Sequence, residues 1–181
     1  THVTISDNTA NSHGAGMYLY YSHPTLTHVT ISNNTANSHG GGMSLWNSNT
    51  TLTHVTISGN TAGNHGGGIC VQFIPFNYAN PTLTNSIIWN NSPQSIFALR
   101  APIITYSDIQ GGFEGEGNIN SDPLFTDYEN SDYTLMENSP CIDAGTADID
   151  GDGVDDIIDY IGLAPDMGAF EFGESSEIMA G

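Results

Sequence analysis

The sequence predicts an all-β fold, a right-handed parallel β-helix (solenoid) of about five coils with an irregular, acidic C-terminal cap. The first observation is a repeat, because Thr1–Met17, Thr27–Met43 and Thr53–Ile69 carry nearly the same residues and start 26 positions apart. The second is the alternation of apolar and polar residues inside each copy, which is typical of a strand with one buried face. A unit this short cannot bury a core alone, so the copies must stack. The right hand follows from the strong preference of parallel crossover connections.

Each repeat divides into two short strands and two turns. Val29–Ser32 alternates with a period of two, and Asn33-Asn34 follows as a turn pair. Gly40–Gly42 permits a backbone corner with positive φ. Alternation resumes in Met43–Leu45. The glycines and clustered β-branched residues oppose a helix, so each 26-residue unit is expected to form one coil.

Stacking places equivalent residues above one another along the solenoid. Valine and isoleucine positions therefore form inward columns, in which each buried side chain stabilises the fold by roughly 1.5–3 kcal/mol. The turn asparagines are expected to form a hydrogen-bonded ladder from coil to coil, and these residues are Asn8, Asn34 and Asn60.

We expect the chain to divide into residues 1–112, the β-helix repeats, and residues 113–181, the last-coil closure and an acidic cap. A diverged fourth coil starts near Leu83 and a fifth near Ile103. The apolar insertion Phe73–Tyr78 is expected to cover an edge of the core. After Gly112 the rhythm breaks, and we expect the tail to fold onto the exposed end of the solenoid.

The charge balance excludes several partners. The 181 residues include one Arg, no Lys and 20 acidic residues, and 19 of these acids fall in residues 108–181. Nucleic acid and anionic membrane surfaces attract basic patches, so neither is an expected partner. No run of 18 apolar residues occurs, so membrane insertion is not expected either.

Two sets of motifs carry a family resemblance. The repeats follow the pattern THVTISxNTAxxxGGGM, and the second half contains SPCIDAG and DMGAFE. These motifs resemble the right-handed parallel β-helix repeats of bacterial and archaeal surface proteins, including their C-terminal part. The resemblance implies the fold and an extracellular or cell-surface location. It does not imply an activity, because the fold hosts lyases, glycosidases, adhesins and inert stalks.

A calcium loop is predicted in Asp148–Asp159. Gly153 stands where an EF-hand loop needs its sharp turn, and Asp155 departs from the aliphatic residue usual at position 8. The loop resembles the calcium loops of dockerins. The predicted ligands are Asp148, Asp150, Asp152, Asp156, Asp159 and the carbonyl group of Val154. A solvated acidic turn is the alternative, although six aspartates in twelve residues repel one another without a cation.

Two histidine columns recur with the repeat, and they consist of His2, His28, His54 and of His13, His39, His65. Imidazoles stacked about 5 Å apart offer nitrogen ligands for Zn²⁺ or Cu²⁺. We favour the alternative, in which the rings stack and form hydrogen bonds, because no carboxylate stands nearby to orient them.

Catalytic residues are not predicted. A lyase needs a Lys or Arg, and Arg100 is the single candidate; a glycosidase needs two placed carboxylates, whereas the repeats contain only Asp7. The expected function is therefore a non-enzymatic, calcium-stabilised structural or adhesive module. A polysaccharide lyase or glycosidase is the alternative, and a glycan- or ice-binding face built from the Thr, Ser and His columns is the third.

Two features bear on assembly and cross-linking. Cys70 and Cys141 form either one disulfide or two buried thiols, and we favour thiols because Cys70 alternates with Val71 in a strand. Thr1–Ile5 is already a strand, so we expect further coils in a longer parent chain, an N-terminal cap, or another copy docking there. Docking would make a homo-oligomer or filament through the solenoid ends.

Overall fold

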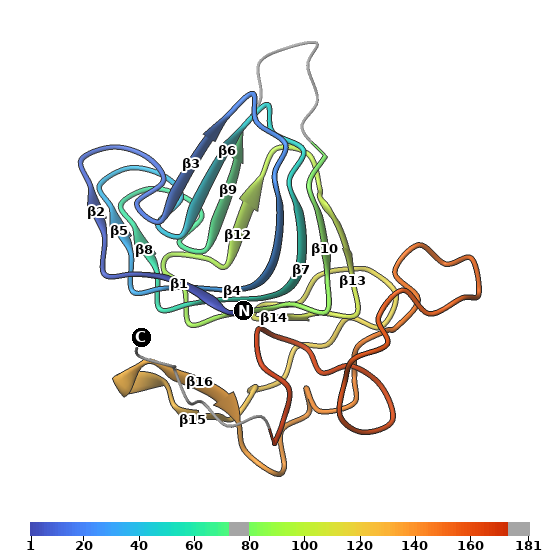
Figure 1. The fold of residues 1–181 in the computed structure, drawn as a ribbon. Helices are drawn as coiled ribbons and strands as arrows, with labels where there is room; N and C mark the ends of the chain where they lie inside the picture. Colours follow the sequence, from blue (N-terminus) through green and yellow to red (C-terminus); the bar gives the residue numbers. More distant parts are fainter. Residues whose placement is uncertain (73–79, 174–181) are drawn as a thin grey trace.

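The computed structural model describes residues 1–72 and 80–173, and it is an all-β parallel solenoid (Figure 1). Successive strands coil around one axis and pair in parallel with their equivalents in the next turn. The largest sheet contains β1 (Val3–Ser6), β4 (Thr25–Ser32), β7 (Thr51–Ser58), β10 (Thr82–Thr84), β11 (Ile87–Trp89), β13 (Ile103–Thr105) and β14 (Asp108–Ile109). The predicted fold class is therefore confirmed.

Two smaller sheets complete each turn. One contains β3 (Met17–Tyr20), β6 (Met43–Trp46), β9 (Ile69–Gln72) and β12 (Ile96–Ala98); the other contains β2 (Thr9–Ala10), β5 (Thr35–Ala36) and β8 (Thr61–Ala62). An antiparallel hairpin follows, formed by β15 (Phe125–Asp127), the 3₁₀ turn η1 (Tyr128–Asn130) and β16 (Asp132–Leu135).

The solenoid has about three complete turns, fewer than the five expected. Val29 pairs with Val55 at the 26-residue offset of the repeat, but Thr51 pairs with Thr82 and Thr82 with Ile103. Those last offsets are 31 and 21 residues, respectively. The β10–β12 turn still adds strands to two of the sheets, whereas β13 and β14 extend only the largest sheet.

The core contains the predicted isoleucine column. Ile31 lies level with Ile5 on one side and with Ile57 on the other, and the column continues through Ile88 to Ile109. Ile31, Ile57 and Ile88 are at most 1% exposed. The repeat therefore places one aliphatic side chain per turn at the centre of the solenoid, where dense packing is most favourable.

The turn asparagines form hydrogen bonds from turn to turn. The Asn34 carboxamide donates to Oδ1 of Asn60 at 2.9 Å and to the Ile5 carbonyl at 2.9 Å. Asn60 repeats the arrangement with Asn91 Oδ1 at 3.0 Å, and Asn8 donates to Asn34 Oδ1 at 2.9 Å. The structure brings the three ladder residues together and adds Asn91 as a fourth.

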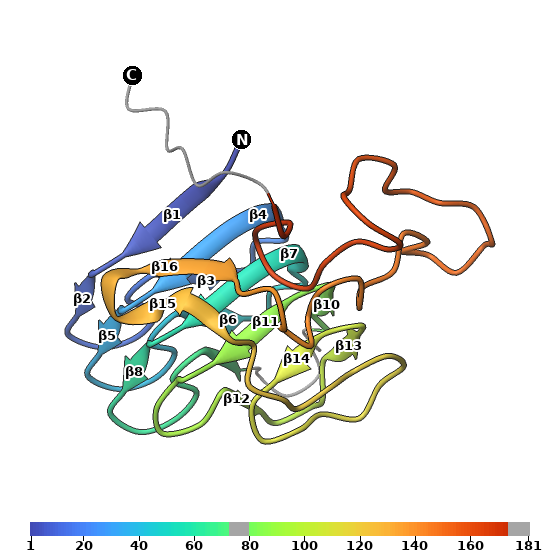
Figure 2. The ribbon, with the colours of Figure 1, turned by 90° about the horizontal axis from the view of Figure 1, so that it is seen from below.

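The tail lies along the side of the solenoid, and not on its end as expected. Figure 2 shows the β15–β16 hairpin and the segment after it crossing the outer face of the largest sheet. Thr30 and Thr56 point outward from that sheet yet are at most 2% exposed, and Thr56 Oγ1 accepts the Ala169 N–H at 2.9 Å. This cover, residues 122–172, packs on a second core of Ile87, Phe125, Tyr133, Leu135, Cys141 and Met167.

Three further observations complete the fold. Both cysteines are buried free thiols, so the disulfide alternative is wrong. The insertion Phe73–Tyr78 lies outside the described residues. Within the described part of the chain, no helix has the length and apolar character needed to span a membrane.

Candidate functional site

Three of the predicted calcium ligands converge. Carboxylate oxygens of Asp148, Asp150 and Asp156 lie within 4.8 Å of one another. The loop wraps around Asp148, whose two carboxylate oxygens accept the N–H groups of Gly151 at 2.7 Å and Gly153 at 2.8 Å. Hard oxygen donors at this separation suit Ca²⁺, which takes six to eight of them.

The other predicted ligands lie outside this group. Asp152 accepts the Val154 N–H at 2.8 Å, and neither Asp152 nor Asp159 joins the convergent carboxylates. Gly153 has a φ of +87°, as the loop pattern requires. The donor set fits calcium through three carboxylates, and the ion's remaining ligands would come from loop oxygens or water.

The first histidine column runs beneath the cover. His28 and His54 stack with ring centroids 5.0 Å apart, and His2 stacks on Phe170 of the cover at 4.6 Å. His54 is 3% exposed and its Nε2 lies 3.3 Å from the Asn85 carboxamide nitrogen. Burial, followed by repulsion from His28, lowers the pKa of His54 to about 4. His54 is therefore neutral at pH 7 and accepts the Asn85 hydrogen bond.

The second column lies between the strands of the two smaller sheets, where His39 pairs with His13 and His65 in parallel bridges. His13 and His39 stack at 5.0 Å, His39 and His65 at 5.4 Å, and His65 stacks on Phe97 at 4.2 Å. Burial, and then repulsion from His13 and His65, lowers the pKa of His39. This column borders an open groove of about 310 Å³, lined by His13, His39, Trp46, Gln72, Phe97 and Leu99.

Neither column forms a convergent nitrogen site. Among the described residues, the aspartate group in the calcium loop is the set of three or more His, Cys, Asp or Glu whose ligand atoms come within 4.8 Å. His28–His54 and His13–His39 stack face to face, whereas His2–His28 meet edge to face and His39–His65 are tilted. The structure therefore gives no support to a Zn²⁺ or Cu²⁺ site in the columns.

Several tail carboxylates hold the cover's irregular backbone. Asp166 accepts the N–H groups of Asp143 at 2.7 Å and Phe172 at 2.6 Å, and Asp143 in turn accepts the Leu163 N–H at 2.6 Å. Glu171 accepts the Asp166 N–H at 3.0 Å. Burial raises the pKa of Asp166. The acids of the C-terminal motif thus satisfy backbone groups that no strand ladder satisfies.

Another buried acid joins the cover to the solenoid. Asp108 in β14 is fully buried, accepts the Ser121 N–H at 3.1 Å and receives the Cys141 thiol at 3.4 Å. Burial raises the pKa of Asp108 to about 6. Since one oxygen is bonded to backbone and the other to a thiol, this carboxyl group is enclosed by protein.

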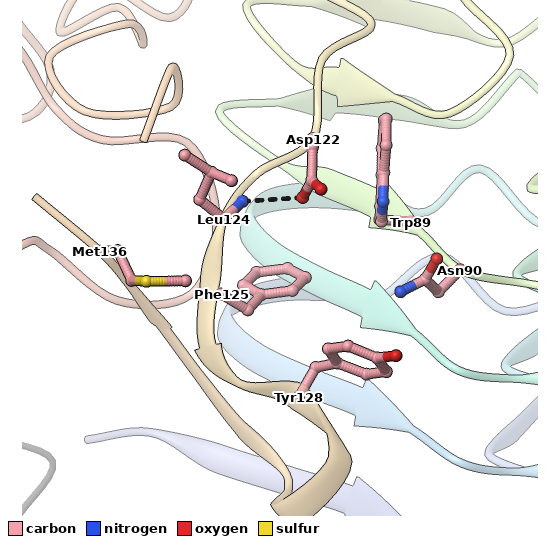
Figure 3. A pocket seen from close by; sticks show the side chains of 7 residues that line it. All are labelled: Trp89, Asn90, Asp122, Leu124, Phe125, Tyr128 and Met136. Carbon is pink, nitrogen blue, oxygen red and sulfur yellow. Dashed lines mark hydrogen bonds between the residues drawn. The ribbon is translucent and has the colours of Figure 1, made fainter. Parts of the chain in front are cut away.

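A cavity of about 320 Å³ lies between β11 and the hairpin (Figure 3). Its lining residues are Trp89, Asn90, Asp122, Leu124, Phe125, Tyr128 and Met136. One Asp122 carboxylate oxygen accepts the Leu124 N–H at 3.0 Å. The sequence pattern does not predict this site, because its two walls come from segments more than 30 residues apart.

Comparison with known proteins identifies the family. A family model described as a right-handed β-helix region matches residues 1–150. Neither the curated proteins nor the solved structures that were compared gave a match. The match covers most of the chain and agrees with the parallel turns described above. The chain therefore belongs to the right-handed β-helix family.

Proposed function

We propose that this chain is a non-enzymatic structural or adhesive module of an extracellular surface protein, with calcium stabilising its lateral cover. Right-handed β-helix domains occur in structural proteins and in carbohydrate-active enzymes, so the fold alone does not choose between them. The choice depends on what the acidic and basic side chains do.

The use of the carboxylates is the observation that carries the proposal. Hydrolysis of a glycosidic bond ordinarily uses two carboxyl groups that flank one substrate-sized space. Among residues 1–72 and 80–173, Asp122 is the single acidic residue lining the 320 Å³ cavity, and none lines the 310 Å³ groove. Asp143, Asp166 and Glu171 accept backbone N–H groups in the cover. Those three acids hold the backbone of the cover, and the part of the chain that the structure describes brings no second carboxylate to the cavity.

Lyase chemistry has equally little support. A polysaccharide lyase needs a basic residue that removes a proton or neutralises the substrate's carboxylate. The chain's single Lys or Arg is Arg100, which lies exposed between β12 and β13. It lines neither the cavity nor the groove.

The calcium component depends on the loop at Asp148. Its first residues are tied to the solenoid, because Thr146 Oγ1 donates to the Asp148 carbonyl at 3.0 Å and Thr146 also bonds to buried Asn85. An ion held by Asp148, Asp150 and Asp156 would remove their mutual repulsion. It would thereby stabilise the part of the cover that has no strand pairing.

The inner turns of the Thr and Ser columns expected to form a glycan- or ice-binding face are covered, whereas Thr4 at the outermost turn is exposed. Thr30, Thr56, Ser32 and Ser58 are at most 2% exposed because the cover lies on them. Assembly through the solenoid edge stays a prediction. β1, β2 and β3 form the outermost strands of the three sheets, and Val3 is 49% exposed there. A second copy or a further coil of a parent chain fits the same edge.

The proposal is tested by a depolymerisation screen. The purified chain is incubated with neutral and acidic polysaccharides, with calcium or with chelator, and reducing ends and unsaturated products are measured. We expect no product above the background of a heat-denatured sample. Turnover that is lost in Asp122→Ala would establish an enzyme and overturn the proposal.

A further inference from the structure

We propose that the cavity between β11 and the β15–β16 hairpin binds a neutral sugar residue of a glycan. The inference deepens the adhesive role proposed above and rests on it, since it names the ligand class and its site. The cavity has about 320 Å³, within the range of small-molecule sites, and one wall belongs to the solenoid while the other belongs to the cover.

Aromatic rings supply the apolar part of the site. Figure 3 shows Trp89 on one side of the cavity, with Phe125 and Tyr128 on the other. Tyr128 is 49% exposed, whereas Phe125 is 7% exposed and anchored in the second core. A large, accessible ring with an anchored neighbour is a rigid platform, and the C–H faces of a pyranose ring pack well on such surfaces.

Two polar side chains supply directional hydrogen bonds. One Asp122 oxygen holds the Leu124 N–H, and the other has no hydrogen-bond partner among the described residues. Asn90 projects into the same space (Figure 3), and its backbone N–H is fixed by Gln110 Oε1 at 2.8 Å. A carboxylate accepts from sugar hydroxyl groups, and a carboxamide both donates and accepts. Together they match the mixed donors and acceptors of a vicinal diol.

Charge argues for a neutral sugar over an acidic one. Of the described residues that line the cavity, Asp122 and Tyr128 alone are ionisable, and the chain carries a net charge of −19. The described residues that line the cavity include no Lys or Arg to pair with a uronate or phosphate group. An anionic ligand would therefore meet repulsion both at Asp122 and in the field of the whole molecule.

A small organic cation is the main competitor. Aromatic rings beside a carboxylate also attract quaternary ammonium groups. The carboxamide of Asn90 favours the sugar, because its N–H groups have no acceptor on an alkylammonium ion. The two ligand classes can be separated directly in one titration.

The chain offers a built-in reporter for this test. It contains two tryptophans, so Trp46→Phe leaves Trp89 as the sole indole, and it lies in the cavity wall. The fluorescence of this variant is titrated with neutral hexoses and their oligosaccharides, with galacturonate, and with tetramethylammonium. We expect a saturable change in Trp89 emission with at least one neutral sugar series and none with the charged probes.

Variants then assign the binding to the cavity. In the Trp46→Phe background, Asp122→Ala and Tyr128→Ala are each expected to weaken binding at least tenfold. Glu129→Ala, which removes an exposed acid next to Tyr128 but outside the lining, should leave binding unchanged. Far-UV circular dichroism and melting curves confirm that each variant is folded.

Three outcomes would overturn the inference: no saturable change with any neutral sugar, equal binding in Asp122→Ala and Tyr128→Ala, or preferential binding of tetramethylammonium or galacturonate. These outcomes leave the non-enzymatic proposal intact. Conversely, release of reducing ends from a bound oligosaccharide would refute that proposal while supporting the sugar site.

Discussion

Asn85 and Thr146 are joined by two hydrogen bonds that tie the cover to the solenoid. The Asn85 carboxamide donates to the Thr146 carbonyl at 2.8 Å, and its oxygen accepts the Thr146 N–H at 2.8 Å. Its second amide proton points to Nε2 of His54, 3.3 Å away. One fully buried side chain therefore links the largest sheet, the histidine column and the start of the calcium loop.

Replacing Asn85 is expected to loosen this junction. Asn85→Ala removes the partners of the half-buried Thr146 N–H and carbonyl, at a cost of about 1 kcal/mol for each group. A loss of several degrees in melting temperature follows for a chain of this size. Asn37→Ala, at an exposed turn, is the control and should melt like wild type. Equal losses in the two variants would show that the junction contributes nothing specific.

The asparagine ladder makes a position-dependent prediction. Asn60 is fully buried, donates to the Ile31 carbonyl at 2.8 Å and accepts from Asn34, whereas Asn8 lies exposed at the outermost turn. Asn60→Ala should therefore cost at least about 3 kcal/mol, and Asn8→Ala less than about 1 kcal/mol. Urea unfolding curves give both values. A larger loss for Asn8→Ala would contradict the ladder account.

His54 should contribute to acid unfolding. Its pKa is lowered to about 4 in the folded state, so between pH 6.5 and 4 the unfolded chain takes up a proton that the folded chain refuses. The free energy of unfolding is therefore unaffected by His54 above pH 6.5. It decreases by roughly 3 kcal/mol as the pH falls from 6.5 to 4. The pH dependence of unfolding in His54→Gln, compared with wild type, should be flatter in this window. If the free energies of unfolding of His54→Gln and wild type changed with pH in parallel, the imidazole of His54 would not be held neutral by burial.

Asp108 should act in the opposite direction. Its pKa is raised from 3.8 to about 6, so the folded state holds the proton more tightly than the unfolded state. Protonated Asp108 therefore adds its full contribution to the free energy of unfolding below pH 4. This contribution is lost as the pH rises through 6. Asp108→Asn keeps an acceptor for the Ser121 N–H and cannot ionise. The stability of this variant relative to wild type should rise between pH 4 and 6, and a constant difference would argue against the shift.

The sequence predicts those parts of the structure that the repeat determines. Identical residues 26 positions apart specify the strand register, the Ile31 column and the Asn34 ladder. The number of later turns was not predictable, because the repeat loses its fixed length. Thr82–Thr84 repeats Thr51–Thr53 at an offset of 31 residues, whereas its next partner, Ile103–Thr105, lies 21 residues on and keeps only the last threonine.

The lateral cover and the cavity were not predictable for a different reason. The alternation of apolar and polar residues predicts that Thr30 and Thr56 face the surface. It cannot show that a distant segment, such as the one containing Ala169, covers them. The adjacent isoleucines Ile87 and Ile88 break this alternation, and they were the feature of the sequence that indicates a strand covered on both faces. One lies in each core, so β11 must be buried on both faces.

Calcium dependence of thermal unfolding tests the central claim most directly. A ligand that binds only the folded state at a hundred times its Kd stabilises by about 2.7 kcal/mol. Melting curves are recorded in calcium and in chelator for wild type, Asp148→Asn and Asp155→Asn; Asp155 lies in the same loop but outside the convergent carboxylates. We predict that calcium raises the melting temperature of wild type and Asp155→Asn, and that Asp148→Asn loses this increase. Superimposable wild-type curves with calcium and with chelator would contradict the account.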